Sequence, residues 1–388
     1  MTQNVLLVVI DAMRADKIYD DGTYKSSKTP FLDSIITKST SFSKAFSVTS
    51  TTTPSFTSIL TGLYPPNHGV RSLYGYKLRN NIPTLPELLK NKGYHTYAEV
   101  TGPLVKEIGL NRGFDAYSYR EKNNTYYSSW GSDFLNNIKK GYYKEPWFIL
   151  LHLWELHSPR FVPSIYDSYK YGWNKYERAL SGLDEYLSKL HSVINNDDVF
   201  ILTGDHGEKI AHNIIHKYYL SLERKVLKYM KKGDGNILLK NMGHGYNVYD
   251  YLTRIPLIIK ANNILKRNIH SNSLCSQIDI LPTIYDILGY NPKKLDLDGC
   301  SLVNSTLNDN RKYIFCEACG SVIPDKKMWK VGIRTDRYKY IYNPYSQNPF
   351  EELYDLAADR KERNNIASKN PELSESFRYL INEKYLKK

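Results

Sequence analysis

Short runs of β-branched and other apolar residues alternate along this chain with longer segments whose apolar residues recur at helical spacing. Four of the runs predict buried strands, at residues 5–10, 96–100, 147–153 and 199–203. Strands that alternate with helices form a parallel sheet with helices packed on both faces. The pattern therefore predicts an α/β fold, a three-layer α/β/α arrangement around a large, mostly parallel sheet.

Helix starts fall between these strands. Thr29 and Thr84 each precede a segment with proline near its first helical position, where proline is well tolerated. Residues 178–193 have apolar residues at helical spacing and lead into the strand before Asp205. These segments supply the order strand, helix, strand that a parallel sheet requires.

The pattern changes near residue 310. Beyond it, Tyr-rich alternating segments at residues 330–335 and 338–342 predict a small antiparallel sheet, and residues 371–388 predict a closing surface helix. We expect a main domain over residues 1–310 and a small α+β subdomain over residues 311–388. Residues 211–242 form a Lys- and Tyr-rich insertion with helical character, and the sequence leaves open whether it is a lid or an interface.

The composition is that of a globular protein, with 388 residues of which 41% are apolar and 24% charged. The formal charge of +13 would suit an acidic partner, but Lys, Asn and Tyr are abundant throughout, which favours biased composition, so no nucleic-acid partner is expected. The first apolar run ends at Asp11 without signal-peptide features, and no segment approaches the roughly 20 apolar residues of a membrane helix. We expect a cytoplasmic protein without a membrane segment, and the oligomeric state stays open.

The cysteines do not indicate a metal site. Of Cys275, Cys300, Cys316 and Cys319, only the last two have the spacing of metal ligands. A zinc site would need a second such pair or two histidines nearby, and neither follows. Buried or reduced thiols are the better interpretation.

Three potential metal ligands directly follow predicted strands. Asp11 ends the first strand, and Asp205 and His206 lie between glycines after the strand at residues 199–203. The carboxyl ends of parallel strands share one edge of the sheet, where ligand sites lie. Asp11 alone is equally consistent with a turn cap, but a carboxylate beside an imidazole at a strand end suits half of a metal site.

Thr52 is the candidate nucleophile, in a hydroxyl-rich segment with Pro54 where a helix would begin. A helix N-terminus has free N–H groups and positive partial charge, which favour an anionic group and a nucleophile that attacks it. An ordinary Ser/Thr helix cap is the alternative. His157 and His244 are further candidates; a single histidine is more often structural, but His244 lies between glycines directly after the insertion.

A set of short motifs runs through nearly the whole chain in a fixed order. They lie at residues 4–16, 29–33, 52–69, 93–96, 113–115, 203–208, 243–245, 254–259, 333–340 and 352–356. Together they resemble the sulfatase family of the alkaline phosphatase superfamily, with the nucleophile signature at residues 52–69. The resemblance implies that family's fold, with a sulfatase-like catalytic domain, and a metal-dependent ester hydrolase.

The departures from a sulfatase bear on the substrate. Thr52 stands where sulfatases have Cys or Ser, and its β-methyl excludes conversion to formylglycine by the usual route. Ala12 replaces the second Asp of the metal pair and Phe56 replaces the signature Arg, so an anion and a cation are lost together and neither is left unpaired. The family's sulfate-binding Lys and His, and the Lys after the 243–245 motif, are replaced by Thr101, Pro103 and Tyr246.

The resemblance implies one divalent metal ion. Its ligands would be Asp11, Thr52, Asp205 and His206, as in single-metal phosphonate monoester hydrolases and headgroup transferases. The imidazole favours manganese or zinc, with calcium possible. Metal coordination would lower the pKa of the Thr52 hydroxyl, which attacks phosphorus or sulfur and forms a covalent ester that water hydrolyses.

Substrate contacts are expected from Thr101, His157 and His244, and either histidine could protonate the leaving alcohol. The main hypothesis is hydrolysis of a small anionic phosphate or phosphonate ester, because a threonyl ester must be resolved by attack at the central atom, as in phosphoryl enzymes. A sulfuric ester hydrolase is the first alternative. A headgroup transferase and a non-catalytic binding relative also stay open.

Overall fold

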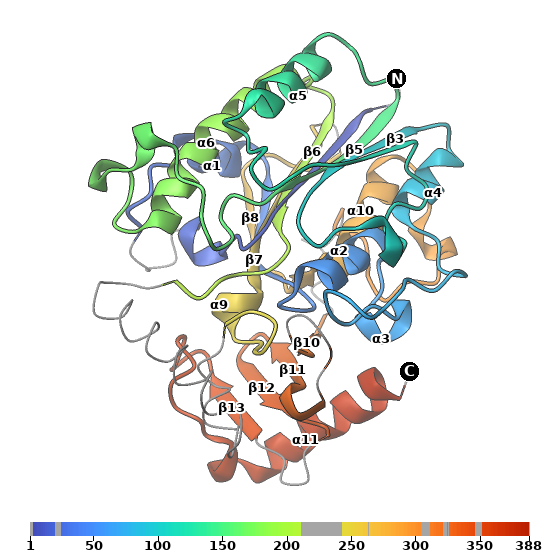
Figure 1. The fold of residues 1–388 in the computed structure, drawn as a ribbon. Helices are drawn as coiled ribbons and strands as arrows, with labels where there is room; N and C mark the ends of the chain where they lie inside the picture. Colours follow the sequence, from blue (N-terminus) through green and yellow to red (C-terminus); the bar gives the residue numbers. More distant parts are fainter. Residues whose placement is uncertain are drawn as a thin grey trace.

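The fold was derived from a computed structural model, which describes residues 3–19, 25–210, 243–262, 264–303, 311–320, 324, 326–345 and 351–387. In this part of the chain a nine-stranded sheet forms the centre of the molecule, with helices on both faces (Figure 1). Its strands follow the order β4-β3-β5-β1-β6-β7-β2-β8, and β9 pairs with β2. The α/β fold with a large, mostly parallel sheet is confirmed.

The predicted strands form the parallel middle of this sheet. They are β1 (Val5–Ile10), β3 (His95–Val100), β5 (Trp147–Leu153) and β6 (Val199–Gly204), with β4 (Ala116–Tyr119) at the edge. β1 lies between β5 and β6 and pairs in parallel with both. Every residue of these three strands is buried, because helices cover both faces of the sheet.

Two groups of helices cover the two faces of the sheet. On one face lie α1 (Pro30–Lys38), α5 (Ser129–Lys139) and α6 (Lys175–Val193), and on the other lie α2 (Thr52–Thr61), α4 (Leu85–Lys90) and α10 (Ile280–Ile287). The predicted starts hold at both prolines, and Thr84 forms a capping box with Glu87. Two short helices, α3 (Pro65–His68) and α9 (Asp250–Thr253), lie in the connections.

The far side of the sheet, where β7 is antiparallel to its neighbours, was not predicted. β7 (Arg254–Lys260) pairs antiparallel with β6 and with β2 (Thr40–Phe46), while β8 (Ile269–Ser271) and β9 (Cys275–Ser276) pair in parallel with β2. β2 is rich in serine, so its sequence lacks the apolar run of a buried strand. Its Ser43 hydroxyl is satisfied instead by Asn272 Oδ1 at 2.6 Å.

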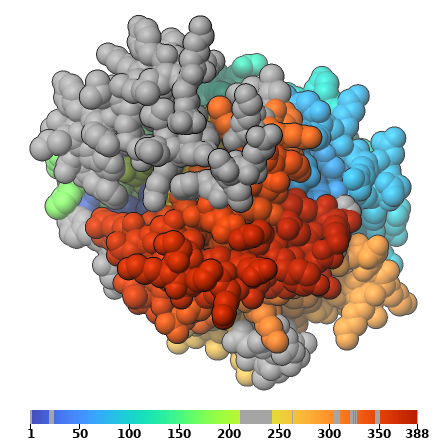
Figure 2. Space-filling model, turned by 90° about the horizontal axis from the view of Figure 1, so that it is seen from below, coloured from blue at the N-terminus to red at the C-terminus, as the bar shows by residue number. Residues whose placement is uncertain are grey.

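The C-terminal region forms the predicted small antiparallel sheet. Its strands are β10 (Tyr313–Ala318), β11 (Lys330–Thr335), β12 (Tyr338–Tyr342) and β13 (Glu351–Asp355). Figure 2 shows this region, in red, along one face of the molecule. The closing helix α11 (Pro371–Ile381) is shorter than predicted, because the chain continues into a π-helical turn (Asn382–Leu386) whose Tyr385 is buried.

The small sheet contacts the segment that leads into α2. The backbone N–H of Glu317 in β10 donates to the carbonyl of Val48 at 2.9 Å. The buried Glu317 carboxylate also pairs with Arg71, with Nη2 and Oε2 2.5 Å apart. β10 therefore supports the segment just before Thr52, although it lies far away in the sequence. Within the described ranges, no helix is long and apolar enough to cross a membrane.

Candidate active site

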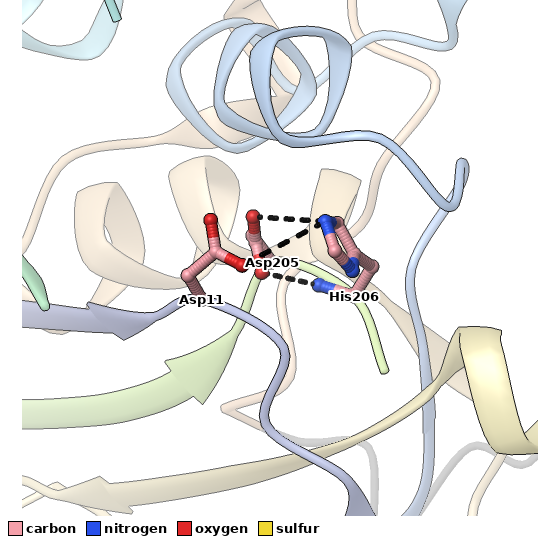
Figure 3. A group of neighbouring side chains, drawn as sticks. All are labelled: Asp11, Asp205 and His206. Carbon is pink, nitrogen blue, oxygen red and sulfur yellow. Dashed lines mark hydrogen bonds and ion pairs between the residues drawn. The ribbon is translucent and has the colours of Figure 1, made fainter. Parts of the chain in front are cut away.

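The carboxyl ends of β1 and β6 bring three potential ligands together. Ile10 and Gly204 are register partners in these parallel strands, so the next residues, Asp11 and Asp205, emerge side by side. One ligand atom from each of Asp11, Asp205 and His206 lies within 4.8 Å of the others, and all three residues are fully buried (Figure 3). The three residues that the strand ends and the family resemblance indicated therefore lie together.

Thr52 is the first residue of α2 and its hydroxyl points into the same cluster. Its Oγ1 lies 3.2 Å from Asp11 Oδ2 and 3.3 Å from His206 Nε2. Thr51 is the N-cap and makes no side-chain capping bond, while the hydroxyl of Thr52 contacts Asp11 and His206. All ten residues of α2 are buried, which holds the helix N-terminus rigidly beside the two carboxylates.

Backbone geometry fixes the Asp205 carboxylate. Its Oδ1 accepts the N–H groups of Ala12 at 3.0 Å and His206 at 2.7 Å. Ala12 holds this position with a φ of 62°, a left-handed conformation that is costly for alanine. Gly207 permits a close contact, since a Cβ there would lie 2.2 Å from the Tyr251 carbonyl oxygen. The turn after β6 thus needs glycine for packing.

The pKa values of the two buried carboxylates in the cluster are shifted in opposite directions. Burial and the neighbouring Asp11 raise the pKa of Asp205 well above its usual value. Burial also acts to raise the pKa of Asp11, but nearby imidazoles, chiefly His157, outweigh it and the pKa is lowered. Burial lowers the pKa of His206 to about 4, so that this ring is neutral near pH 7.

These residues fit a divalent metal ion. Asp11 Oδ1 and Asp205 Oδ2 are buried and have no hydrogen-bond partner within the described ranges. The ion pairs recorded for these two carboxylates involve histidines, not lysine or arginine. Two buried carboxylates with free oxygens beside a neutral imidazole are the donor set of a mixed oxygen and nitrogen metal site. Thr52 Oγ1 lies at its edge.

His244 and His157 face the cluster from two other loops. The His244 ring stacks on His206 with centroids 4.9 Å apart, and the His157 ring meets His244 edge-on at 5.2 Å. Glu208 Oε1 lies 3.3 Å from His244 Nδ1. Burial lowers the pKa of His244, but the Glu208 carboxylate outweighs burial and the pKa is raised. His244 therefore holds a proton more readily than the other histidines here.

Thr101 is connected to this group through Trp154. The Thr101 hydroxyl is buried and lacks a hydrogen-bond partner among the described residues. The next residue, Gly102, lies against the Trp154 ring so closely that a Cβ would be 2.5 Å from it. Trp154 in turn packs on His157, with ring centroids 4.1 Å apart. Thr101 therefore borders the histidine loop, and no contact with Asp11, Asp205 or His206 is recorded.

Sequence reasoning missed His152, Trp154 and Glu208. His152 lies within β5, and its Nε2 is 3.7 Å from Asp11 Oδ2. A lone histidine within the apolar run of residues 147–153 was the available signal, because a polar ring in a buried strand needs a partner. Glu208 is the last residue of the 203–208 motif, but its pairing with His244 depends on a residue far away in the sequence.

Two further predictions concern regions away from the cluster. The insertion at residues 211–242 lies outside the described residues. Cys275, Cys316 and Cys319 are buried, Cys300 is exposed, and none forms a disulfide in the described structure. In the same ranges, the one group with metal-ligand geometry is that of Asp11, Asp205 and His206. The reduced-thiol interpretation agrees with this arrangement.

Comparison with known proteins gives two family matches. Residues 3–290 match the model of the sulfatase family, and residues 245–384 match that of the C-terminal region of N-sulphoglucosamine sulphohydrolase. An ulvan-active sulfatase of Formosa agariphila is 24% identical, over 95% of this chain and 77% of that protein. Human arylsulfatase K is 23% identical, over 96% of this chain and 80% of that protein. The crystal structure of a phosphonate monoester hydrolase of Agrobacterium radiobacter superposes with a TM-score of 0.76 at 18% identity, over 98% of this chain and 95% of that one.

Proposed function

The chain belongs to the sulfatase family, and within that family we propose that it is a metal-dependent hydrolase of sulfuric esters. The names of its curated relatives support this substrate class, although the sequence pattern first favoured phosphorus esters. The observation that carries the ester hydrolase chemistry is the cluster in which Thr52, Asp11, Asp205 and His206 face one another at the carboxyl edge of the sheet. The choice of sulfuric esters is supported by the names of the relatives.

Asp11, Asp205, His206 and Thr52 would hold the metal ion. When bound, the ion supplies positive charge that stabilises anions at the site. Manganese or zinc fits this donor set better than calcium, because one donor is an imidazole and Ala12 removes a carboxylate that would favour calcium. No formylglycine is expected, because Thr52 carries a β-methyl group.

The Thr52 hydroxyl is the proposed nucleophile. Its Oγ1 loses its proton to solvent and forms a bond to sulfur while the bond from sulfur to the ester oxygen breaks. The N-terminus of α2 stabilises the sulfuryl oxygens. His244, held by Glu208, donates a proton to the leaving alcohol, and His157 binds a sulfuryl oxygen together with Thr101. Water then attacks sulfur and the bond from sulfur to Thr52 Oγ1 breaks. One proton of the water restores the Thr52 hydroxyl, the other returns to His244, and sulfate leaves.

Phosphate or phosphonate ester hydrolysis is the second candidate, and Thr52 itself favours it. A formylglycine releases sulfate by expelling it from a hydrated aldehyde, whereas a threonyl ester must be attacked at its central atom. The likeness to a phosphonate monoester hydrolase supports the shared fold only. Both candidates use the same cluster, so they differ in the acid group alone.

A metal-reconstituted activity panel separates the two candidates. The purified chain is loaded with Mn²⁺, Zn²⁺ or Ca²⁺ and assayed with aryl sulfates, aryl phosphate mono- and diesters, and phosphonate monoesters. The proposal expects the highest kcat/KM for a sulfate ester. A higher value for a phosphorus ester would replace it with the second candidate. Transfer of the group to an added alcohol would identify a transferase, and binding without turnover would identify a non-catalytic relative.

We further propose that residues 1–310 form the catalytic domain and residues 311–388 a separate subdomain. The change from a parallel to an antiparallel sheet supports this boundary. The contact between Glu317 and Val48 supports a role for the subdomain in holding the segment before Thr52. Limited proteolysis that cleaves near residue 310 without releasing the C-terminal part would agree with both statements.

A further inference from the structure

A histidine inside the central sheet contacts the proposed metal site without belonging to it. His152 lies in β5, and the next residue, Leu153, accepts the backbone N–H of Asp11 at 2.8 Å. The His152 side chain is fully buried, and its Nε2 lies 3.7 Å from Asp11 Oδ2. The ring therefore approaches the Asp11 carboxylate from within the sheet, on a rigid strand.

Both ring nitrogens of His152 lack a hydrogen-bond partner among the described residues. A buried polar group without a partner costs about 1–3 kcal/mol, so an apolar residue here would favour folding. The recorded ion pair of this ring is with Asp11. A shift of about 0.5 Å would bring Nε2 within hydrogen-bond distance of that carboxylate.

Phe56 explains why this position needs a histidine. It stands where the sulfatase signature has arginine, and it cannot donate a hydrogen bond. Its ring meets the His152 ring edge-on with centroids 4.8 Å apart, and Trp154 meets it edge-on at 5.9 Å. These aromatic rings restrict the imidazole, while its Nε2 is the donor group near Asp11 that residue 56 does not supply.

The proposed reaction of Thr52 explains why Asp11 needs a second hydrogen-bond donor. In the structure, the Thr52 hydroxyl donates to Asp11 Oδ2, the same oxygen that His152 Nε2 approaches. When Thr52 acts as a nucleophile its proton leaves, and Oδ2 loses that donor. A second donor that does not take part in the reaction would keep the carboxylate in the same orientation.

We infer that His152 is a positioning residue that donates from Nε2 to Asp11 Oδ2, so that Asp11 Oδ1 is directed to the metal ion. This inference rests on the proposed metal site, and it adds a residue to which the family resemblance assigns no role. His152 and Phe56 together replace the arginine of the signature, the first as the donor and the second as the apolar support of its ring.

The test compares variants that differ in the donor. His152→Leu removes it, and His152→Gln keeps an amide N–H donor in a side chain of similar reach. Mn²⁺ and Zn²⁺ affinities are measured by titration calorimetry, and folding is monitored by thermal unfolding without metal. His152→Leu should weaken metal binding by about 10–100-fold, and His152→Gln should restore it to within a few-fold of the original chain.

His68→Leu is the matched control. His68 is also fully buried, but it bonds to Ser58 Oγ at 2.9 Å and accepts the N–H of Val70, away from the carboxylates. This variant should lower the unfolding temperature and leave metal affinity unchanged. If His152→Leu bound metal as tightly as the original chain, or if His152→Gln bound as weakly as His152→Leu, the inference would be wrong.

A double variant tests the replacement of arginine directly. In the double variant Phe56→Arg/His152→Ala, the new guanidinium should lie beside Asp11 and donate to it. The double variant should therefore bind metal at least tenfold more tightly than His152→Ala alone. Failure of the proposed function remains distinguishable, because it would appear as metal binding by the original chain without turnover of any ester. That result would leave the affinity differences, and therefore the inference, intact.

Discussion

Two buried carboxylate sites in this molecule differ in how they are satisfied. Asp279, fully buried before α10, receives both Arg311 Nη atoms at 2.6 and 2.7 Å and the N–H groups of Ser276 and Cys300 at 2.8 and 2.9 Å. Asp11 and Asp205 are equally buried, but each has one oxygen without a partner in the described part. Both sites lie among residues that follow strands.

The difference separates a structural site from a functional one. Around Asp279 every oxygen has a charged or backbone donor, so the pair can stabilise the join between α10 and the chain before β10. Around Asp11 and Asp205 the carboxylates repel each other, and folding without a cation must tolerate this cost. A protein keeps such a site when an external ion or substrate completes it.

The largest effect is expected when the nucleophile is removed from the site of Asp11 and Asp205. Thr52→Ala should lower kcat by on the order of a thousandfold or more for the best ester substrate, since a covalent step is lost. Steady-state kinetics with saturating metal measure it, and Thr52→Ser, which keeps a hydroxyl, is the control. An alanine variant that retained most of the rate would refute nucleophilic catalysis by Thr52.

The next prediction compares how the two carboxylate sites, Asp279 and the pair of Asp11 and Asp205, affect the free energy of unfolding. Without metal, Arg311→Met should destabilise the fold by about 3–5 kcal/mol, because it leaves the buried Asp279 carboxylate unpaired. Asp205→Asn should not destabilise it, because it removes repulsion with Asp11, yet it should abolish metal binding and activity. Urea unfolding in the presence of a chelator measures both. If Asp205→Asn were the more damaging of the two, Asp205 would be a structural residue.

The dependence on pH sharpens the contrast. Because the pKa of Asp205 is raised in the folded state, its proton stabilises the metal-free protein below the usual Asp pKa, and this stability is lost as pH rises through the raised pKa. Metal must displace the same proton, so metal affinity should rise by up to about tenfold per pH unit over that range. His206, with a pKa of about 4, should add nothing above pH 5.

Calorimetric titration of Mn²⁺ at several pH values between 5 and 8 tests this dependence, and urea unfolding of the metal-free chain tests the opposite trend in stability. In the metal-free Asp205→Asn variant, the decrease in the free energy of unfolding that comes from ionisation of Asp205 as pH rises should be absent. An affinity that stayed constant with pH would show that Asp205 is already ionised without metal.

The smallest effect concerns backbone strain beside the site. Ala12→Gly should stabilise the metal-free protein by about 0.5–1 kcal/mol, because glycine adopts the φ of 62° without steric cost. Ala179→Gly, within α6, should instead destabilise it by at least about 1 kcal/mol. Thermal unfolding of the two variants should therefore show shifts of opposite sign.

Most of the fold was predictable because its signals are local. The apolar runs of β1, β3, β5 and β6 and the proline starts of α1 and α4 are each encoded within about ten residues. β2 was missed because its serines are buried by bonding to residues 269–272, a compensation that no local pattern reveals. Likewise, the end of α11 depends on where Tyr385 packs, beside Tyr64 and Phe315.

The candidate site divides in the same way. Asp11, Asp205 and His206 were predictable because parallel strands bring their carboxyl ends to one edge, and because the sulfatase-like motifs contain the same residues. His152 and Glu208 were not, because each lies beside a partner from another element, Asp11 in one case and His244 in the other. An apolar run that contains one histidine predicts a buried strand, but the role of the histidine depends on which residue of another element lies beside it.

The sequence by itself therefore determined the layers of the fold, the family resemblance and the residues at the strand ends, since all of these follow from local patterns and short motifs. Only the tertiary structure decided which charges are compensated. Asp279 finds Arg311 thirty-two positions away, while Asp11 and Asp205 meet each other and no lysine or arginine in the described residues. Electrostatic energy depends on distance in space, and distance along the chain does not encode it.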